Sequence, residues 1–377
     1  MSSVNLISIG RHVWTSPVQD QDVDFPVAAG LADRLGGEHH VIGRASTGRG
    51  SVECAGAVVV HRLAADAPTW RFVRDAAHVT RELAHSLGAP TVILTSDVAG
   101  ALVSLRNRRS TRTPVVVQVQ GAVLHPGREY GAWLKRSLIG LTMRAAVRRA
   151  DAIRALNPFI AGQLRALGVA APVAVIGSRV DTHRFAPAST PSPGPPRIGA
   201  VGGLVPVKNH DVLLRALAEL SADAPTTELV IVGDGPLRSQ LDERARALGI
   251  GDRITFCGAI PHSQVPDVLR SLTVFAQPSR SEGEPRAVLE AQAVALPVVV
   301  SDIPAHHAVV SDARTGLLVT VDDPAAWATA FRKLSSDREL AAALGAAGRE
   351  QACNEHDFDA LLDRFADFIR SAAVAAG

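Results

Sequence analysis

The sequence predicts an α/β protein of two domains, each a parallel sheet covered by helices. Short apolar runs alternate with helix-like stretches in both halves of the 377 residues, a pattern typical of strands joined by helical crossovers. A proline-rich stretch, residues 186–196, separates the halves. The halves also differ in charge, because residues 1–190 hold 22 Lys and Arg against 13 Asp and Glu, whereas residues 191–377 hold 17 against 24. A chain of this length can bury a core in each domain.

The composition narrows the class of protein. With 47% hydrophobic and 20% charged residues, the chain has the make-up of a soluble globular protein rather than a disordered one. No apolar run approaches the about 18 residues of a membrane span, and the first residues lack the length and charge of a signal peptide. Cys54, Cys257 and Cys353 are far apart and lack metal-ligand spacing. We expect a cytoplasmic protein that holds no metal.

The first half begins with an apolar strand at residues 4–10 and a helix at residues 25–37 that two glycines end. A second helix is expected at residues 69–88. Four more apolar runs predict buried strands: residues 40–45, 57–63, 91–96 and 114–121. The polar loop between the first strand and the first helix contains Asp20, Asp22 and Asp24. Such acidic loops are usually solvated, so we expect it to border the cleft between the domains rather than to bind a metal.

Residues 132–154 predict a basic amphipathic helix. Its polar face carries Lys135, Arg136, Arg144, Arg148 and Arg149. Such a helix can lie on an anionic membrane or attract an acidic substrate. We favour a solvated outer face, because Trp133 is the only aromatic anchor. Nucleic-acid binding is disfavoured, since the chain has a single Tyr and no interleaved aromatic residues for base stacking.

The second half repeats the strand and helix alternation. Strands are expected at residues 197–203, 228–236, 254–258, 273–279 and 297–302, with helices between them. Loops that follow the strands of a parallel sheet gather at one edge, where ligands bind. Gly202, Gly203, Lys208, Gly235 and Glu290 all lie on these loops or on the helices just after them. The chain has neither the dinucleotide fingerprint nor a phosphate-binding P-loop motif, which disfavours a nicotinamide enzyme or a nucleotide hydrolase.

The stretch SRSEGEPRAVLEAQAVALP, residues 279–297, is the centre of the predicted site. Gly283 permits a tight turn, and Pro285 suits the first position of a helix that we expect to run to Leu296. The start of that helix can bind an anion such as a diphosphate, while Glu282 and Glu290 accept hydrogen bonds from hydroxyl groups. The spacing alone also fits a surface helix with a solvated Glu. The surrounding motifs favour the sugar-phosphate interpretation.

Those motifs resemble the retaining glycosyltransferases of family 4. The similarity rests on VGGLVPVKNHDVLLRAL, LVIVGDGPLRSQL, ITFCGAI, SRSEGEPRAVLEAQAVALPVVVSDIPAHHAVV and TGLLVTVDDP, which occur in the family order. The resemblance implies the GT-B fold, in which two Rossmann-like domains face each other across a cleft and the last helix returns to the first domain. We therefore expect an N-terminal acceptor domain at 1–185, a linker at 186–196, a nucleotide-sugar domain at 197–355 and a final helix at 356–377.

The resemblance also implies roles for individual residues. Lys208 would contact the donor diphosphate, Glu282 the hydroxyls of the donor sugar and Glu290 those of the ribose, so Lys208 and Glu282 are the catalytic candidates. The main chain near Gly258 would hold the base. The remaining donor-side candidates are Gly202, Gly203, Gly283, Glu284, Pro285, Arg286 and Ala287. Those on the acceptor side are His12, Asp20, Asp22, Gln120 and Gly121.

Four departures from the family pattern affect these implied roles. The usual Arg of the first loop in the second domain is Gly203, and the usual His of the T-x-H-G segment is Gln120. The polar loop with the aspartates replaces a Gly-Gly loop, and Glu284 replaces a Phe. Either Arg11, Arg179 or Arg286 supplies the missing charge, or donor chemistry has been lost; we favour the first. Glu284 would pair with a basic group on a substrate or, as we favour, be an exposed loop carboxylate.

The sequence thus predicts a metal-independent retaining glycosyltransferase that needs no cofactor. Its co-substrate would be a nucleotide-diphosphate sugar, with UDP or GDP the expected nucleotides. The acceptor would be a small molecule, anionic if it binds the basic half, and neither nucleic acid nor a peripheral membrane contact is favoured. The alternative from another class is a sugar-nucleotide-binding or partner subunit without activity. A nucleotide-sugar epimerase of similar fold ranks last, because its sequence pattern differs.

Overall fold

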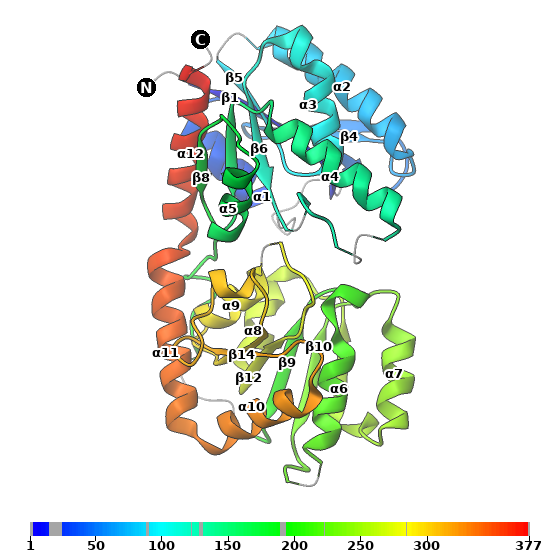
Figure 1. Ribbon diagram of the computed structural model, residues 1–377, viewed down its shortest axis with the longest axis vertical. Coiled ribbons are helices and arrows are strands. Elements are labelled where there is room, and N and C mark those ends of the chain that lie inside the picture. Colours follow the sequence, from blue (N-terminus) through cyan, green and yellow to red (C-terminus); the bar gives the residue numbers. More distant parts are fainter. Residues whose placement is uncertain are drawn as a thin grey trace. The chain divides into compact units, whose positions relative to one another are not determined.

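The computed structural model describes residues 3–14, 25–87, 90–121, 123–127, 131–188, 194–221, 223–283 and 285–375. The chain forms two compact units, each with its own sheet (Figure 1). The first unit comprises residues 1–177 and 360–377, and the second comprises residues 178–359. The predicted fold class, α/β with two parallel sheets, is confirmed.

The first unit contains an eight-stranded sheet in the order β3-β4-β2-β1-β5-β6-β7-β8. All neighbours pair in parallel except β3 and β4, which are antiparallel. The strands are β1 Asn5–Trp14, β2 His39–Ala45, β3 Ser51–Ala55, β4 Val58–Leu63, β5 Thr91–Thr95, β6 Val115–Val119, β7 Ala152–Ala155 and β8 Val173–Val175. The sequence did not predict β3, because its side chains are mostly exposed and it lacks an apolar run.

Helices pack on this sheet through two separate groups of apolar side chains. Ile7 and Ile93 belong to the larger group, which also includes buried residues of α2, α3, α4 and α5. Val41 and Val58 belong to a smaller group with α1. The helices are α1 Phe25–Leu35, α2 Thr69–Ser86, α3 Val98–Thr111, α4 Trp133–Val147 and α5 Pro158–Ala166. Strand residues thus alternate between the groups, as expected for a sheet buried on both faces.

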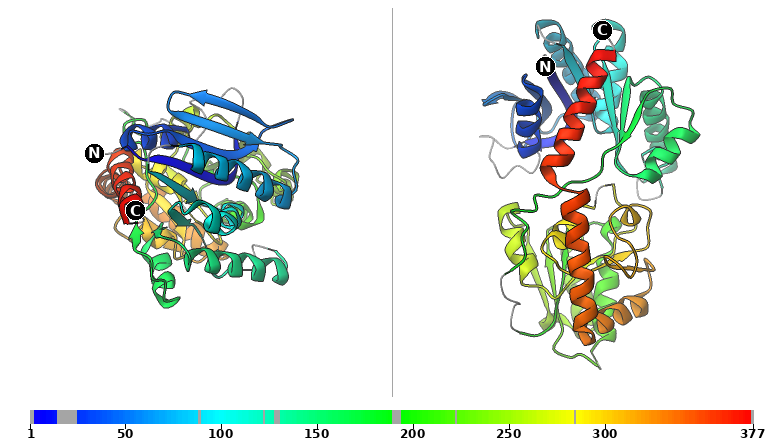
Figure 2. Two further views of the ribbon diagram at one scale, coloured as in Figure 1. Left: turned by 90° about the horizontal axis from the view of Figure 1, so that it is seen from above. Right: turned by 90° about the vertical axis from the view of Figure 1, so that its left-hand side faces the viewer.

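The last helix, α12 Phe358–Ala375, packs within the first unit as the sequence analysis expected (Figure 2, right). Leu362, Phe365 and Ile369 are fully buried on its inner side. The Arg154 guanidinium of β7 lies 4.4 Å from the centre of the Phe365 ring, and Arg34 of α1 donates to Asp363 at 2.5 Å. The amphipathic pattern of this helix therefore matches the surface that it covers.

The second unit contains a six-stranded parallel sheet in the order β11-β10-β9-β12-β13-β14. Its strands are β9 Arg197–Val201, β10 Glu228–Val232, β11 Ile254–Gly258, β12 Val274–Gln277, β13 Val298–Ser301 and β14 Leu317–Val319. The chain thus builds outward from β9 to β11 and then returns to add β12 to β14 on the other side. This is the order of a dinucleotide-binding sheet, whose ligands bind where the order reverses.

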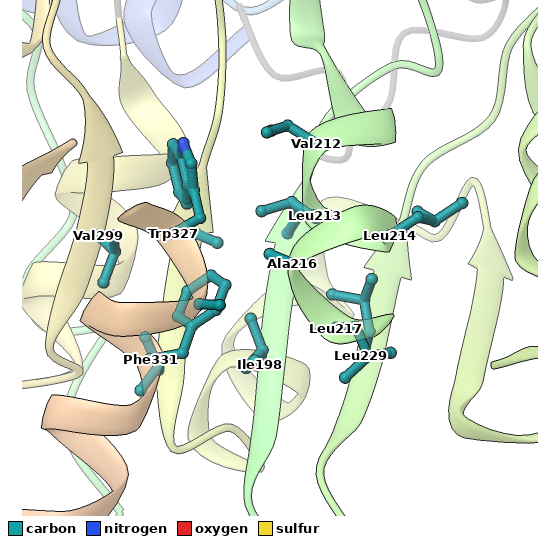
Figure 3. Close-up of a cluster of buried hydrophobic side chains, with 14 of the residues drawn as sticks. Ile198, Val212, Leu213, Leu214, Ala216, Leu217, Leu229, Val299, Trp327 and Phe331 are labelled. Carbon is teal, nitrogen blue, oxygen red and sulfur yellow. The ribbon is translucent and has the colours of Figure 1, made fainter. Parts of the chain in front are cut away.

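Two apolar layers cover this sheet. On one face, Ile198 and Leu229 pack against α6 and α10, with Trp327 and Phe331 of α10 fully buried (Figure 3). On the other face, Val230 packs in a group that includes α8 and α9. The helices are α6 His210–Glu219, α7 Arg238–Ala247, α8 Val265–Arg270, α9 Arg286–Ala293, α10 Pro324–Ser336 and α11 Arg338–Glu355. None of the described helices has the length and apolarity needed to cross a membrane.

The structure corrects three predicted boundaries. The first unit ends at Gly177 rather than at residue 185, because Val180 N donates to His356 O at 2.8 Å and joins the second unit. The expected helix at 132–154 ends at Val147, and residues 152–155 form a buried strand. The helix expected at residues 285–296 runs from 286 to 293, because Ala295 adopts a left-handed conformation that ends it.

Candidate active site

The candidate site lies at the carboxyl ends of β9 and β12, which are neighbours at the point where the strand order of the second sheet reverses. The loop after β9 leads to the short helix Pro206–Lys208, called η2 here. The loop after β12 leads to α9. The chain leaves β9 towards β10 and leaves β12 towards β13, which lie in opposite directions across the sheet. The loops after β9 and β12 therefore separate and leave a ligand site between them.

Glu282 and Lys208 form an ion pair at this point. Lys208 Nζ lies 2.6 Å from Glu282 Oε1. Gln277 Nε2, at the end of β12, and Ser279 Oγ donate to the same oxygen at 2.7 and 2.6 Å. The Glu282 side chain is only 7% exposed, whereas that of Lys208 is 24% exposed. Three donors thus hold the Glu282 carboxylate in place. The Lys208 side chain, in contrast, remains partly accessible.

Arg280 connects the loops that carry Lys208 and Glu282. Its N–H donates to Val207 O at 2.8 Å, and its Nη1 donates to Pro206 O at 2.9 Å. Its Nη2 donates to Asp322 Oδ1 at 2.6 Å, an atom that also accepts from Asn209 Nδ2 at 3.2 Å. Arg280 therefore fixes the turn that presents Lys208 to Glu282. Arg280 lies in the stretch identified as the centre of the predicted site, but no role was predicted for it, because its partners are distant in sequence.

Close backbone contacts between the loops after β9 and β10 explain two glycines near the site. A Cβ on Gly233 would lie 2.0 Å from Gly202 O, and a Cβ on Gly235 would lie 2.6 Å from Leu204 O. Both positions therefore need glycine. Gly203 differs, since a Cβ there would meet Asp234 O at 3.7 Å, an ordinary contact. The backbone does not force the absence of the usual Arg at this position.

Glu290 projects from α9 and lies beside the loop after β11. Its Oε1 is 2.8 Å from His262 Nε2, and its side chain is 12% exposed. The His262 ring packs on buried Phe185, with 5.5 Å between the ring centres. Gly258 ends β11 in a left-handed conformation and accepts a hydrogen bond from Gly233 N at 2.8 Å. The structure thus places Glu290 of α9, the predicted ribose contact, beside the loop that begins after Gly258, the predicted base contact. His262 was not foreseen.

Helix α9 begins shortly after Glu282 in the chain. Pro285 is the residue before the helix rather than its first residue. The N–H groups of Arg286 and Ala287 begin the helix, where backbone donors have no partner in the preceding turn. The Arg286 side chain is exposed, and Gly283 is partly exposed. Glu284 lies outside the described residues.

Two buried histidines flank the ion pair. His306 Nδ1 lies 2.8 Å from Ser301 O, so this nitrogen carries the proton. Its Nε2 has no hydrogen-bond partner within the described part of the chain. Burial lowers the pKa of His306 to about 4, and the charges of Glu282 and Lys208 act on it in opposite directions. Burial likewise lowers the pKa of His210, next to the Lys208 turn, to about 4. Both rings are neutral at pH 7.

Some of the remaining predicted residues can be located in the structure, and the others lie outside the residues that it describes. Gln120 and Gly121 follow β6 in the first unit, and Gly121 has a φ of 60°. Arg179 lies over the Phe358 ring at 5.8 Å, so it stacks on an aromatic side chain of the second unit. The loop with Asp20, Asp22 and Asp24, and the side chains of Arg11 and His12, lie outside the described residues. Where the structure is described, no group of three His, Cys, Asp or Glu side chains could hold a metal ion.

Two family models match this chain, one in each half. Residues 182–351 match the family described as glycosyl transferases group 1, and residues 26–178 match a glycosyl transferase 4-like domain. The chain belongs to the glycosyltransferases of the family 4 type. The stated resemblance is therefore confirmed.

Individual relatives agree with this assignment. A GDP-mannose-dependent alpha-(1-6)-phosphatidylinositol monomannoside mannosyltransferase of Mycobacterium tuberculosis is 32% identical over 225 residues, which cover 54% of this chain and 57% of the relative. A D-inositol 3-phosphate glycosyltransferase of Rhodococcus opacus is 38% identical over 175 residues, which cover 44% of this chain and 39% of the relative. The matched region thus spans less than two thirds of each relative.

Solved structures of similar fold cover nearly the whole chain. A sucrose-phosphate synthase from Thermosynechococcus elongatus has a TM-score of 0.85 at 20% identity, covering 98% of this chain and 99% of that one. HepE of Anabaena, solved in complex with UDP and glucose, has a TM-score of 0.76 at 16% identity, covering 97% and 99%. These similarities confirm the GT-B fold class.

The buried His306 predicts a loss of stability in acid. Between its ordinary pKa of 6.5 and the folded value of about 4, the unfolded chain binds a proton that the folded chain does not. The free energy of unfolding therefore falls as pH decreases through this window, by up to about 1.4 kcal/mol per pH unit for one such group. Urea denaturation at several pH values gives the free energy of unfolding as a function of pH. This free energy should fall less steeply with decreasing pH in His306→Gln than in the wild-type protein. An identical slope would contradict the assignment.

Proposed function

We propose that the protein transfers a sugar from a nucleotide-diphosphate donor to an acceptor with retention of the anomeric configuration. The observation that carries this proposal is the Lys208–Glu282 pair at the reversal point of the second sheet. One cation and one carboxylate at this position suit a ligand that carries both phosphates and hydroxyls. Similarity to a GDP-mannose-dependent mannosyltransferase supports a nucleotide-sugar donor, and similarity to a D-inositol 3-phosphate glycosyltransferase supports transfer of a sugar.

In the proposed binding mode, the diphosphate lies between Lys208 and the first N–H groups of α9. Lys208 supplies a positive charge, and the helix start supplies backbone donors and a partial positive charge. Glu282 accepts from hydroxyls of the donor sugar while its hydrogen bonds to Gln277 and Ser279 keep the carboxylate in place. Glu290 accepts from the ribose hydroxyls, with His262 orienting it.

The proposed reaction breaks the bond between the sugar C1 and the diphosphate oxygen. The acceptor hydroxyl attacks C1 from the same face, and the leaving diphosphate takes the hydroxyl proton. The nucleoside diphosphate leaves with that proton, and a new glycosidic bond of unchanged configuration forms. Negative charge grows on the diphosphate during bond breaking, and Lys208 stabilises it through a preorganised contact. Neither a metal ion nor a protein base is part of this proposal.

A sugar-nucleotide-binding subunit without activity is the second candidate, and Gly203 favours it. This position lacks the usual cationic side chain although the backbone has room for one. The two candidates differ in turnover. Incubation with UDP, GDP, ADP and TDP sugars and a panel of acceptors should release the nucleoside diphosphate only if the protein is a transferase. A donor that binds, shown by a raised melting temperature, but is never consumed with any acceptor would support the binding subunit.

Lys208→Ala is expected to lower turnover by about 10²-fold. Removing one preorganised contact to developing charge commonly costs about 3 kcal/mol of transition-state stabilisation. The measurement is release of nucleoside diphosphate from the accepted donor. Lys333→Ala serves as the matched control, because Lys333 is an exposed lysine on α10 of the same unit. Equal turnover in Lys208→Ala and wild type would refute the diphosphate role.

Glu290→Ala is expected to weaken binding of the free nucleoside diphosphate as well as the intact donor. The ribose is common to both ligands, so losing its hydrogen bonds reduces both affinities, by about tenfold for one charged hydrogen bond. Titration calorimetry gives the two dissociation constants. Glu350→Ala, at an exposed position on α11, is the control. If only the intact donor bound more weakly, the carboxylate would contact the sugar instead of the ribose.

A further inference from the structure

Helix α4 exposes an apolar stripe to solvent. The side chains of Leu134, Leu138 and Leu141 are 67%, 65% and 61% exposed, and Trp133 at the start of the helix is 69% exposed. Positions separated by four and three residues lie on the same face of a helix. The three leucines therefore form one continuous stripe. The solvated outer face predicted from the sequence thus also carries an apolar stripe, which the pattern of charges did not reveal.

The stripe is not needed to hold α4 in place. The opposite face carries Gly140, Met143, Ala146 and Val147, all of which are buried in the first unit. Met143, Ala146 and Val147 belong to the main apolar group of the first sheet, beside residues of α3. Since these inner residues already anchor the helix, the leucines contribute little to folding. A contiguous exposed apolar surface of this kind usually marks an interaction site.

Basic residues border the stripe. Lys135, Arg148 and Arg149 are exposed, whereas Arg144 turns inward and its Nε donates to Leu124 O at 3.1 Å. The sequence contains no Asp or Glu between Glu129 and Asp151. The exposed residues of α4 and of the turn after it therefore combine an apolar stripe with basic side chains.

We propose that α4 binds an anionic lipid surface, with the leucine stripe and Trp133 inserted at the level of the headgroups. Exposed leucine and tryptophan with flanking lysine and arginine are typical of helices that lie in the membrane interface. Each basic residue near an anionic leaflet strengthens attachment. A second copy of the chain is a poorer partner, because it would bring the basic side chains of two such surfaces together. The proposal extends beyond the transferase activity and does not depend on it, since α4 is in the first unit and the donor residues are in the second.

Vesicle flotation tests the proposal with the full-length chain. The wild-type protein should float with phosphatidylcholine vesicles that contain phosphatidylglycerol and bind pure phosphatidylcholine at least about tenfold more weakly. The variant Leu134→Gln/Leu138→Gln/Leu141→Gln should bind the anionic vesicles about tenfold more weakly or worse. The variant Lys135→Gln/Arg148→Gln/Arg149→Gln should bind the anionic vesicles about a hundredfold more weakly than the wild type.

A matched control separates the stripe from general surface hydrophobicity. Val52 on β3 and Phe159 on α5 are also exposed, at 63% and 52%, and lie in the same unit. Val52→Gln/Phe159→Gln should bind anionic vesicles like the wild type. Equal losses in the control and the leucine variant would overturn the assignment to α4. Melting temperatures of all variants without vesicles show whether each remains folded.

Trp133 supplies a second readout that does not depend on folding differences. Its emission should shift to shorter wavelength when anionic vesicles are added, and Trp133→Phe should abolish that shift while the protein still floats. Two results would overturn the proposal. One is the absence of binding to either vesicle. The other is a concentration-dependent dimer in sedimentation that the leucine variant abolishes, since this would identify a second copy as the partner.

Discussion

The arrangement of the candidate active site depends on the carboxylate of Glu282. Three donors converge on its Oε1, from the end of β12, from the loop after β12 and from the turn after β9. The carboxylate therefore joins the two strands between which the sheet order reverses. It also determines where Lys208 points, because a flexible lysine side chain has no preferred direction without such a partner. In the proposed binding mode, a diphosphate then meets a lysine that is already ordered.

Backbone contacts reinforce this arrangement. Arg280 binds the carbonyl groups of the turn that carries Lys208, and Gly233 and Gly235 let the neighbouring loops approach one another. Main-chain atoms thus leave no room for a side chain at Gly233 and Gly235, whereas a Cβ at Gly203 would make only an ordinary contact. We interpret Gly203 as a change of side chain on an intact loop rather than as a sign that the loop has been remodelled.

The sequence was a good guide where the pattern was local and regular. Alternating apolar runs predicted five of the strands in the second sheet, and Lys208, Glu282 and Glu290 could be placed on loops at one edge because parallel strands end there. It was a poor guide to partners. His262 and Arg280 act through contacts with residues that are distant in sequence, and local patterns do not reveal such contacts. The leucine stripe of α4 was also not predicted, because counting the charges of the helix says nothing about the angular positions of its leucines.

A double-mutant cycle between Lys208 and Glu282 tests the central claim most directly. The affinity of wild type, Lys208→Ala, Glu282→Gln and the double variant is measured by calorimetry for whichever of UDP or GDP the protein binds. If Glu282 positions Lys208, the losses of binding free energy in the two single variants overlap, and the double variant binds about as weakly as Lys208→Ala. The coupling free energy between the two side chains is then about 1 kcal/mol or more. Losses that add within about 0.5 kcal/mol would show that the two side chains act independently and would contradict the account.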